Sequence, residues 1–242
     1  FRLAKSTAEL RKEPITLSSA DASSGEYKVR EKLKLTDVSP EEGIALLNEV
    51  EKALVKGKAK VSARFLHLSM KSKEKVLVTS EGTEITSTLP QIAFYYMITV
   101  AATGKGSAQR SFSYSKTSGW EAVSEWTLPT VLESEARALA ENLRKGRRAP
   151  KQKLDVITGS EIVGIAVHES VGHPYEADRI LGREAAQAGE SFVTREMVGT
   201  EIGSDAVTVV DDPRVEGSPG YYLYDDEGVK ARKRILIKNG VI

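Results

Sequence analysis

QIAFYYMITVAATGKGSAQRSFSY, residues 91–114, sets the fold class of this chain. Residues 91–102 are apolar and partly β-branched, Thr103-Gly-Lys-Gly106 is a turn signal, and Arg110–Tyr114 alternates in polarity. Further strand-like runs precede it at 61–65, 76–78 and 84–89, with Glu81-Gly82 as a turn between the last two. Short strands separated by tight turns predict an antiparallel meander.

Helical patterns lie on both sides of this meander. Ser39-Pro40-Glu41-Glu42 has the form of a capping box with proline at the first helical position. Apolar residues at helical spacing follow it, and Gly57 ends the run; they are Ile44, Leu47, Val50 and Leu54. Pro129–Lys145 repeats this pattern with Leu132, Ala136, Leu139, Ala140 and Leu143. The sequence therefore predicts an α+β fold in which helices pack against an antiparallel sheet.

Two smaller predictions concern the N-terminal half. Glu26–Leu35 alternates in polarity and is a candidate strand. His67 falls on the same strand face as Val61, Ala63 and Phe65, so we expect a half-buried sheet residue rather than a metal ligand.

Composition narrows the class of protein. The 242 residues carry a formal net charge of +1, which gives no general argument for nucleic acid or an anionic membrane as a partner. The chain contains no cysteine, so disulfides and thiolate metal ligands within it are excluded. The longest apolar stretch, near 92–102, is too short to span a bilayer, and the first residues do not resemble a signal peptide.

A basic run follows the second helical pattern and surrounds Pro150. It contains Arg144, Lys145, Arg147, Arg148, Lys151 and Lys153. A phosphate or nucleic-acid contact is one interpretation, but no aromatic residues interleave with these charges, and a solvated interdomain linker is favoured. The predicted domains are 1–150, an N-terminal α+β domain, and 151–242, the first part of a C-terminal domain.

The second region is predicted to be mostly β around one apolar helix. Leu154–Ile157 and Ala206–Val210 have the composition of strands, and Ser160 is placed to cap a helix over 160–167 that is apolar on nearly all sides and expected to be buried. Arg234–Lys238 is a further strand, and Asn239-Gly240 is a hairpin signal followed by only two residues. This shortened hairpin and the absence of an initial methionine lead us to expect that the natural polypeptide is longer at both ends.

HESVGH, residues 168–173, holds two of the three histidines beside a glutamate. Imidazoles are good zinc ligands, and a nearby carboxylate can take a proton from a metal-activated water. The two histidines are five residues apart, however, which places them about 140° apart on a straight α-helix at about 100° per residue. A shared metal ion requires the helix to end near Gly172 and Pro174, or to contain a π-bulge. The alternative is a structural pairing of Glu169 with a histidine.

Two acidic groups downstream leave alternatives open. Glu176 and Asp178 are each a possible third ligand, an orienting partner of a ligand, or simply a solvent-facing charge. Tyr224-Asp-Asp-Glu-Gly228 is a possible cation site, although turn chemistry explains it better.

The chain resembles the TldD/PmbA (TldD/TldE) family over three segments of its C-terminal third. They are GIAVHESVGHPYEAD (164–178), VTVVDDPRVEG (207–217) and YDDEGVKARKRILIKNGVI (224–242), with a weaker match at SPEEGIALLNEV (39–50). The resemblance implies a TldD-type zinc metallopeptidase subunit that is cytoplasmic, acts on peptides or unfolded segments, and pairs with a related subunit lacking the histidine motif. It also implies His168 and His173 as zinc ligands, Glu169 as general base, and a downstream cysteine as third ligand, which this chain lacks.

These patterns lead to one expected function and two alternatives. We expect zinc-dependent peptide hydrolysis, with an exposed strand edge near the site available to an extended peptide. The first alternative is a non-catalytic subunit or peptide-binding module with structural histidines. The second is nucleic-acid binding through residues 144–153, which would depend strongly on salt.

Overall fold

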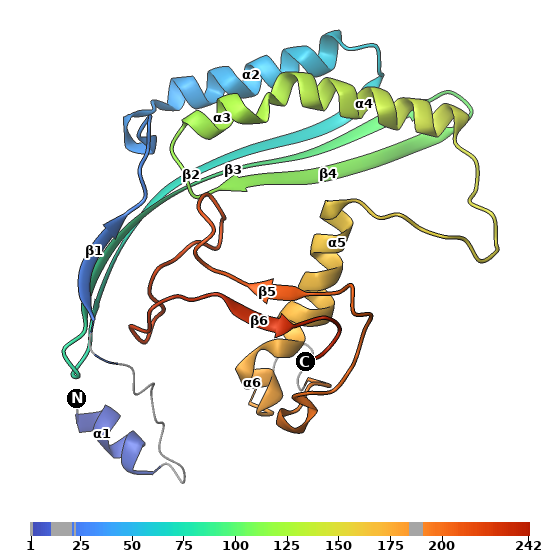
Figure 1. Cartoon of the computed structure of the whole chain (residues 1–242). Helices are drawn as coiled ribbons and strands as arrows, with labels where there is room; N and C mark the ends of the chain where they lie inside the picture. Colours follow the sequence, from blue (N-terminus) through green and yellow to red (C-terminus); the bar gives the residue numbers. More distant parts are fainter. Residues whose placement is uncertain (1, 11–20, 22, 184–190) are drawn as a thin grey trace.

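A long curved sheet covered by helices on one face forms the larger part of the molecule (Figure 1). The computed structural model of the chain describes residues 2–10, 21, 23–183 and 191–242. The N-terminal elements are α1 (Arg2–Glu9), β1 (Ser24–Lys28), η1 (Leu35–Asp37), α2 (Pro40–Lys56), β2 (Val61–Val78), β3 (Glu84–Ala102), β4 (Gly106–Lys116), α3 (Glu121–Trp126) and α4 (Leu128–Lys145). Helices and a mostly antiparallel sheet confirm the α+β fold class.

Strand β3 is the centre of this sheet. It pairs antiparallel with β2 from Val61↔Val100 to Val78↔Glu84, and with β4 from Ile92↔Lys116 to Ala102↔Gly106. The remaining part of the β4-side edge is taken by β1, which runs parallel to β3. The predicted meander is therefore confirmed, with strands longer than the sequence runs suggested. The candidate strand over 26–35 was only partly right, because β1 ends at Lys28 and Leu35 begins a 3-10 turn.

The core lies between the sheet and the pair α2 and α4. Alternate side chains of β3 point to the helices and are almost completely buried; they are Ile92, Phe94, Tyr96, Ile98 and Val100. From the helices they meet Leu46, Val50, Leu54, Leu128, Leu132 and Ala136. The predicted stripe on α4 is confirmed. On α2 the predicted Val50 and Leu54 are buried and Leu47 is partly buried, whereas Ile44 is 56% exposed and Leu46 is buried in its place.

The start of α2 offers a test of local stability. Ser39 Oγ accepts a hydrogen bond from the Glu42 N–H at 3.2 Å, and the Ser39 N–H donates to Glu42 Oε2 at 2.8 Å, which confirms the capping box. We expect Ser39→Ala to lower the free energy of unfolding by about 1 kcal/mol, because the cap satisfies an N–H that the helix cannot. Urea unfolding followed by circular dichroism measures this, and Ser39→Asp, which retains an acceptor, should stay close to the unmodified protein.

The opposite sheet face carries no helix of the N-terminal region. Phe65 is 52% exposed there and stacks on His67 with ring centroids 6.3 Å apart. His67 shares its face with Ala63 and Phe65 as predicted, whereas the register shift after Val61 turns Val61 to the core. His67 is exposed rather than half-buried, because α2 and α4 both pack on the other side of the sheet.

Residues 151–242 lie on this second side of the sheet, below it in Figure 1. Their elements are α5 (Ser160–Val167), the π-helical turn η2 (His168–Gly172), η3 (His173–Tyr175), α6 (Ala177–Ile180), η4 (Arg195–Met197), β5 (Val209–Asp211) and β6 (Arg234–Ile237). Loops tie this region to the sheet: Thr117 Oγ1 donates to the Ser218 carbonyl at 2.7 Å, Gln91 Nε2 donates to the Pro219 carbonyl at 3.2 Å, and Lys75 pairs with Asp226. These contacts hold residues 151–242 against the side of the sheet opposite to α2 and α4.

Several local predictions for this region were wrong or only partly right. Residues 154–157 are extended but form no strand, since nothing within the described part of the chain pairs with them. The strand predicted over 206–210 begins at Val209. Ser160 makes no side-chain cap, because Gly159 occupies the cap position.

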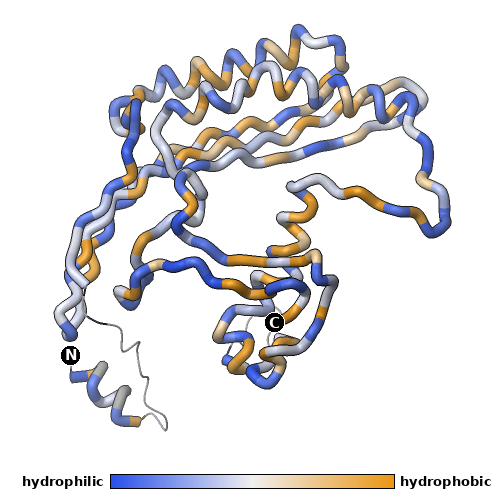
Figure 2. The backbone as a smooth tube through the Cα atoms, in the orientation of Figure 1, coloured by the Kyte–Doolittle hydropathy of each residue, from blue (hydrophilic) through white to orange (hydrophobic). Residues whose placement is uncertain are grey.

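Helix α5 is apolar but is not buried. Figure 2 shows it as one of the most hydrophobic segments of the chain, yet Ile162 is 58% and Ile165 60% exposed. The expectation of a buried helix was wrong because no element in the described ranges packs over its outer surface.

The hairpin after β6 follows its sequence signal. Asn239 and Gly240 both have positive φ, 50° and 80°, as a type I′ turn requires, and the Lys238 N–H donates to the Val241 carbonyl at 2.8 Å. A Cβ at position 240 would lie 2.2 Å from the Gly203 carbonyl oxygen, so the turn also needs glycine for close backbone approach. Across the described residues, no helix is long and apolar enough to cross a membrane.

Candidate metal centre

A π-helical turn at the end of α5 brings the two histidines of HESVGH together. The N–H of His173 donates to the carbonyl of His168, five residues back, rather than to the residue four back. This wider turn places residues five apart on nearly the same face of the helix. The local helix break predicted from the five-residue spacing is thus confirmed, in its π-bulge form.

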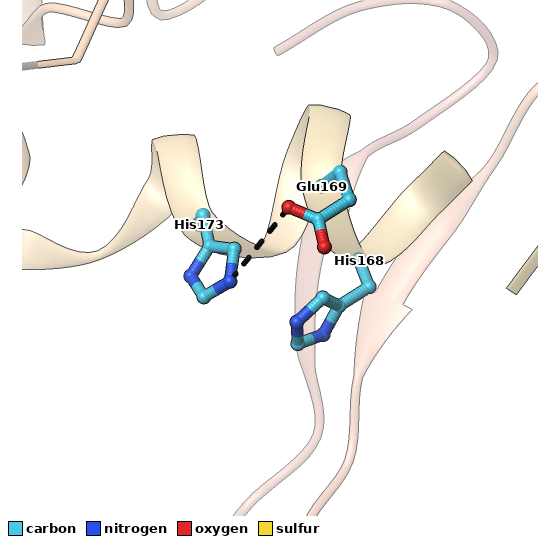
Figure 3. Close-up of side chains that lie close together, drawn as sticks. All are labelled: His168, Glu169 and His173. Atoms are coloured by element: carbon cyan, nitrogen blue, oxygen red, sulfur yellow. Dashed lines mark ion pairs between the residues drawn. The ribbon is translucent and has the colours of Figure 1, made fainter. Parts of the chain in front are cut away.

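The side chains converge on one point (Figure 3). The imidazole centroids of His168 and His173 are 4.4 Å apart, with planes at 72°. Potential ligand atoms of His168, Glu169 and His173 all lie within 4.8 Å of one another, and Glu169 Oε2 is 4.0 Å from His173 Nε2. The structure therefore brings all three predicted site residues together.

Glu176 lies behind His173. Its Oε1 is 2.7 Å from His173 Nδ1, and its Oε2 accepts a hydrogen bond from Arg179 Nε at 2.6 Å. The hydrogen bonds from His173 and Arg179 lower the pKa of Glu176 below its usual value, so the group is a carboxylate that accepts from both neighbours. Asp178 is not one of the converging residues, and its Oδ1 accepts a hydrogen bond from the Arg179 N–H at 2.9 Å.

The histidines open onto a groove of about 640 Å³ between the π-turn and the β5–β6 ribbon. A groove of this size is typical of a site for a small molecule or a short peptide segment. One wall carries apolar side chains of the ribbon, Val209, Val210 and Leu236. The ion pair of Arg234 with Asp211, at 3.4 Å, spans the two strands at the same place. The site is open to a substrate on one side and backed by helix on the other.

The donor set suits a zinc ion. Two imidazoles are nitrogen ligands that zinc prefers, and catalytic zinc sites use three protein ligands with one open position. The His173 Nε2 faces the cluster, while its Nδ1 is held by Glu176, which is the arrangement that orients metal-bound imidazoles. The residues present therefore fit two of the three protein ligands of such a site.

The other candidate residues lie outside the centre. In the turn at 224–228, Asp225 Oδ1 accepts from the Glu227 and Val229 N–H groups, each at 2.9 Å, so this segment has the hydrogen bonds of a turn. The basic run over 144–153 leaves the end of α4 and continues as an exposed segment without regular structure after Lys145. Arg179 and the β5–β6 wall of the groove were not predicted from the sequence. The three-residue spacing of Glu176 and Arg179 was a signal for an ion pair between them.

A helix-borne pair of histidines with a carboxylate, opening on a peptide-sized groove, is a metallopeptidase type of centre. Comparison with known proteins agrees with this class. Residues 33–149 match the family model described as the PmbA/TldA metallopeptidase central domain, and residues 151–242 match the PmbA/TldA metallopeptidase C-terminal domain. The chain belongs to the TldD/PmbA metallopeptidase family.

Individual relatives support the same assignment. Metalloprotease MJ0996 of Methanocaldococcus jannaschii is 31% identical over 243 residues, which cover 100% of this chain and 51% of that protein. The zinc metalloprotease TldD homolog of Saccharolobus solfataricus is 32% identical over 102 residues, 42% of this chain and 21% of that protein. The chain thus spans about half the length of the first of these curated relatives.

The fold is also similar to that of a solved structure. TldE from Thermococcus kodakarensis superposes with a TM-score of 0.61 over 99% of this chain and 52% of that one, at 20% sequence identity. The likeness shows a shared fold.

Proposed function

We propose that this chain is part of a zinc-dependent metallopeptidase that hydrolyses peptides or unfolded protein segments. The observation that carries the proposal is the convergence of His168, Glu169 and His173 within 4.8 Å at the end of α5. His168 and His173 hold the zinc, and the cysteine that the family resemblance implies as third ligand is not among these 242 residues, which contain none.

Each side chain has a separate task in this proposal. A bound zinc ion would supply a Lewis acid that activates water and polarises the scissile carbonyl. Glu169, 4.0 Å from His173 Nε2, takes the proton of the attacking water and later delivers it to the leaving amine. Its side chain is 64% exposed, so water and substrate reach it.

The groove beside the centre supports a peptide as substrate. An extended segment can lie between the π-turn and the ribbon, with apolar side chains against Val209 and Val210. Main-chain groups at the free edge of the two-stranded β5–β6 ribbon can add to its binding by strand pairing.

Cellular setting and partners form part of the same proposal. We place the protein in the cytoplasm, in an assembly with a related subunit, as the family resemblance implies. The alternative is a non-catalytic subunit or peptide-binding module in which the histidines are structural. Zinc content separates the two.

Metal analysis tests the proposal directly. The intact natural polypeptide should contain about one zinc ion per site, and a chelator should remove both the metal and peptide hydrolysis, with recovery on adding zinc. Elemental analysis and cleavage of an unfolded protein such as reduced casein measure the two properties. The 242-residue chain alone should bind zinc more weakly, because one ligand is missing.

His67→Ala is the matched control, since His67 lies on the sheet and outside the centre. His168→Ala should lose zinc, whereas His67→Ala should keep it. Intact polypeptide that is folded, free of zinc after preparation in zinc-containing medium, and destabilised by His168→Ala would favour the structural alternative instead.

A further inference from the structure

We propose that Glu176 and Arg179 form a positioning pair that fixes the ring of His173, so that its Nε2 faces the metal centre. This inference rests on the proposed function for the identity of the bound metal. It concerns two residues that lie outside the histidine cluster and contact it from behind.

The two contacts form a continuous chain. Arg179 Nε donates to Glu176 Oε2 at 2.6 Å, and Glu176 Oε1 lies 2.7 Å from His173 Nδ1. A carboxylate can only accept, so Nδ1 carries the proton that is donated to Glu176. In a neutral imidazole this leaves Nε2 as the nitrogen with a free lone pair, and Nε2 is the one that lies 4.0 Å from Glu169 Oε2.

The same contacts exclude Glu176 as a metal ligand in this arrangement. Both of its oxygens are engaged, one by His173 and one by Arg179. It is also absent from the set of groups whose ligand atoms lie within 4.8 Å of one another. Of the roles open to Glu176 from sequence, orientation of a ligand is the one that the geometry favours.

Arg179 is itself held in place. Its side chain is only 12% exposed, and its carbonyl accepts a hydrogen bond from the Ser191 N–H at 3.1 Å. Ser191 Oγ donates to the Pro174 carbonyl at 2.7 Å, one residue beyond His173. The positioning pair therefore connects the ring of His173 to the returning chain at Ser191, which restricts rotation of the imidazole.

Zinc affinity and the tautomer of His173 test this inference in the intact polypeptide. Glu176→Ala should weaken zinc binding by about 10–100-fold, and Arg179→Met by about 10-fold, the range found for orienting partners of metal ligands. Because both act through one link, the double variant should lose about as much as Glu176→Ala alone. Competition with a chromophoric chelator measures the affinities. Asp178→Asn removes a neighbouring charge without touching His173 and should stay within about twofold.

Nitrogen-15 shifts of the metal-free protein at pH 8 give a readout that needs no zinc. His173 should be the Nδ1–H tautomer, and Glu176→Ala, or Glu176→Leu if the alanine variant does not fold, should shift it toward Nε2–H, because neither replacement has a side-chain acceptor. An unchanged tautomer in a folded variant overturns the inference. Failure of the unmodified protein to bind zinc refutes the proposed function instead, and leaves the tautomer result to decide this inference separately.

Discussion

Replacing Glu169 with glutamine should lower the turnover of peptide hydrolysis by about 10²–10⁴-fold while zinc stays bound. Glutamine has nearly the same shape but cannot accept the proton of the attacking water at neutral pH. The histidines would keep their positions, because they are brought together by the π-turn and not by Glu169. The measurement is single-turnover cleavage of a fluorogenic peptide alongside zinc analysis of the same sample.

Glu161→Gln is the matched control for this experiment. Glu161 lies in the first turn of the same helix, outside the histidine cluster, so its substitution removes one negative charge from α5 and should leave turnover within about twofold. Equal turnover in Glu169→Gln and the unmodified protein, with zinc present in both, would contradict the general-base role.

The largest effect on folding should come from Phe94→Ala. Phe94 is fully buried on the central strand, between neighbouring β2 and β4 and beneath α2 and α4. We expect a loss of about 3–5 kcal/mol in the free energy of unfolding, because the cavity cannot collapse between strands held on both sides. Urea titration followed by circular dichroism measures the difference.

Tyr95→Ala is the matched control for the core. Tyr95 is the next residue on the same strand, points to the opposite face, and is only half-buried. Its truncation should cost less than half as much as that of Phe94. Equal losses in the two variants would show that the buried side of the sheet does not dominate stability.

The elements that follow strong local signals could be predicted from the sequence. The capping box begins α2, the apolar stripe marks α4, and Asn239-Gly240 makes a type I′ turn, since each depends on neighbours within a few residues. The irregular turn between His168 and His173 could also be predicted, because two histidines five residues apart on a regular α-helix cannot bind the same metal ion. In each case the physical cause lies inside the segment itself.

What could not be predicted depends on distant parts of the chain. Parallel pairing of β1 with β3 has no local signal, and residues 154–157 have strand composition but no partner. The exposure of α5 could not be predicted either. Its apolar composition indicates a preference for burial but does not say which element would cover it. Arg179 was overlooked because its importance comes from contact with Glu176 and not from its own type.

Because the wide turn at 168–172 brings the histidines together, a chain can contain the motif residues and still lack the assembled site. A variant that keeps all six letters of HESVGH, but lets this segment tighten into an ordinary α-helix, would place His173 about 140° around the helix from His168, at about 100° per residue. Searching genomes for the motif alone would count such a protein as an active peptidase. A hydrogen bond from the N–H of the second histidine to the carbonyl five residues earlier is therefore a better criterion for an assembled site than the motif itself.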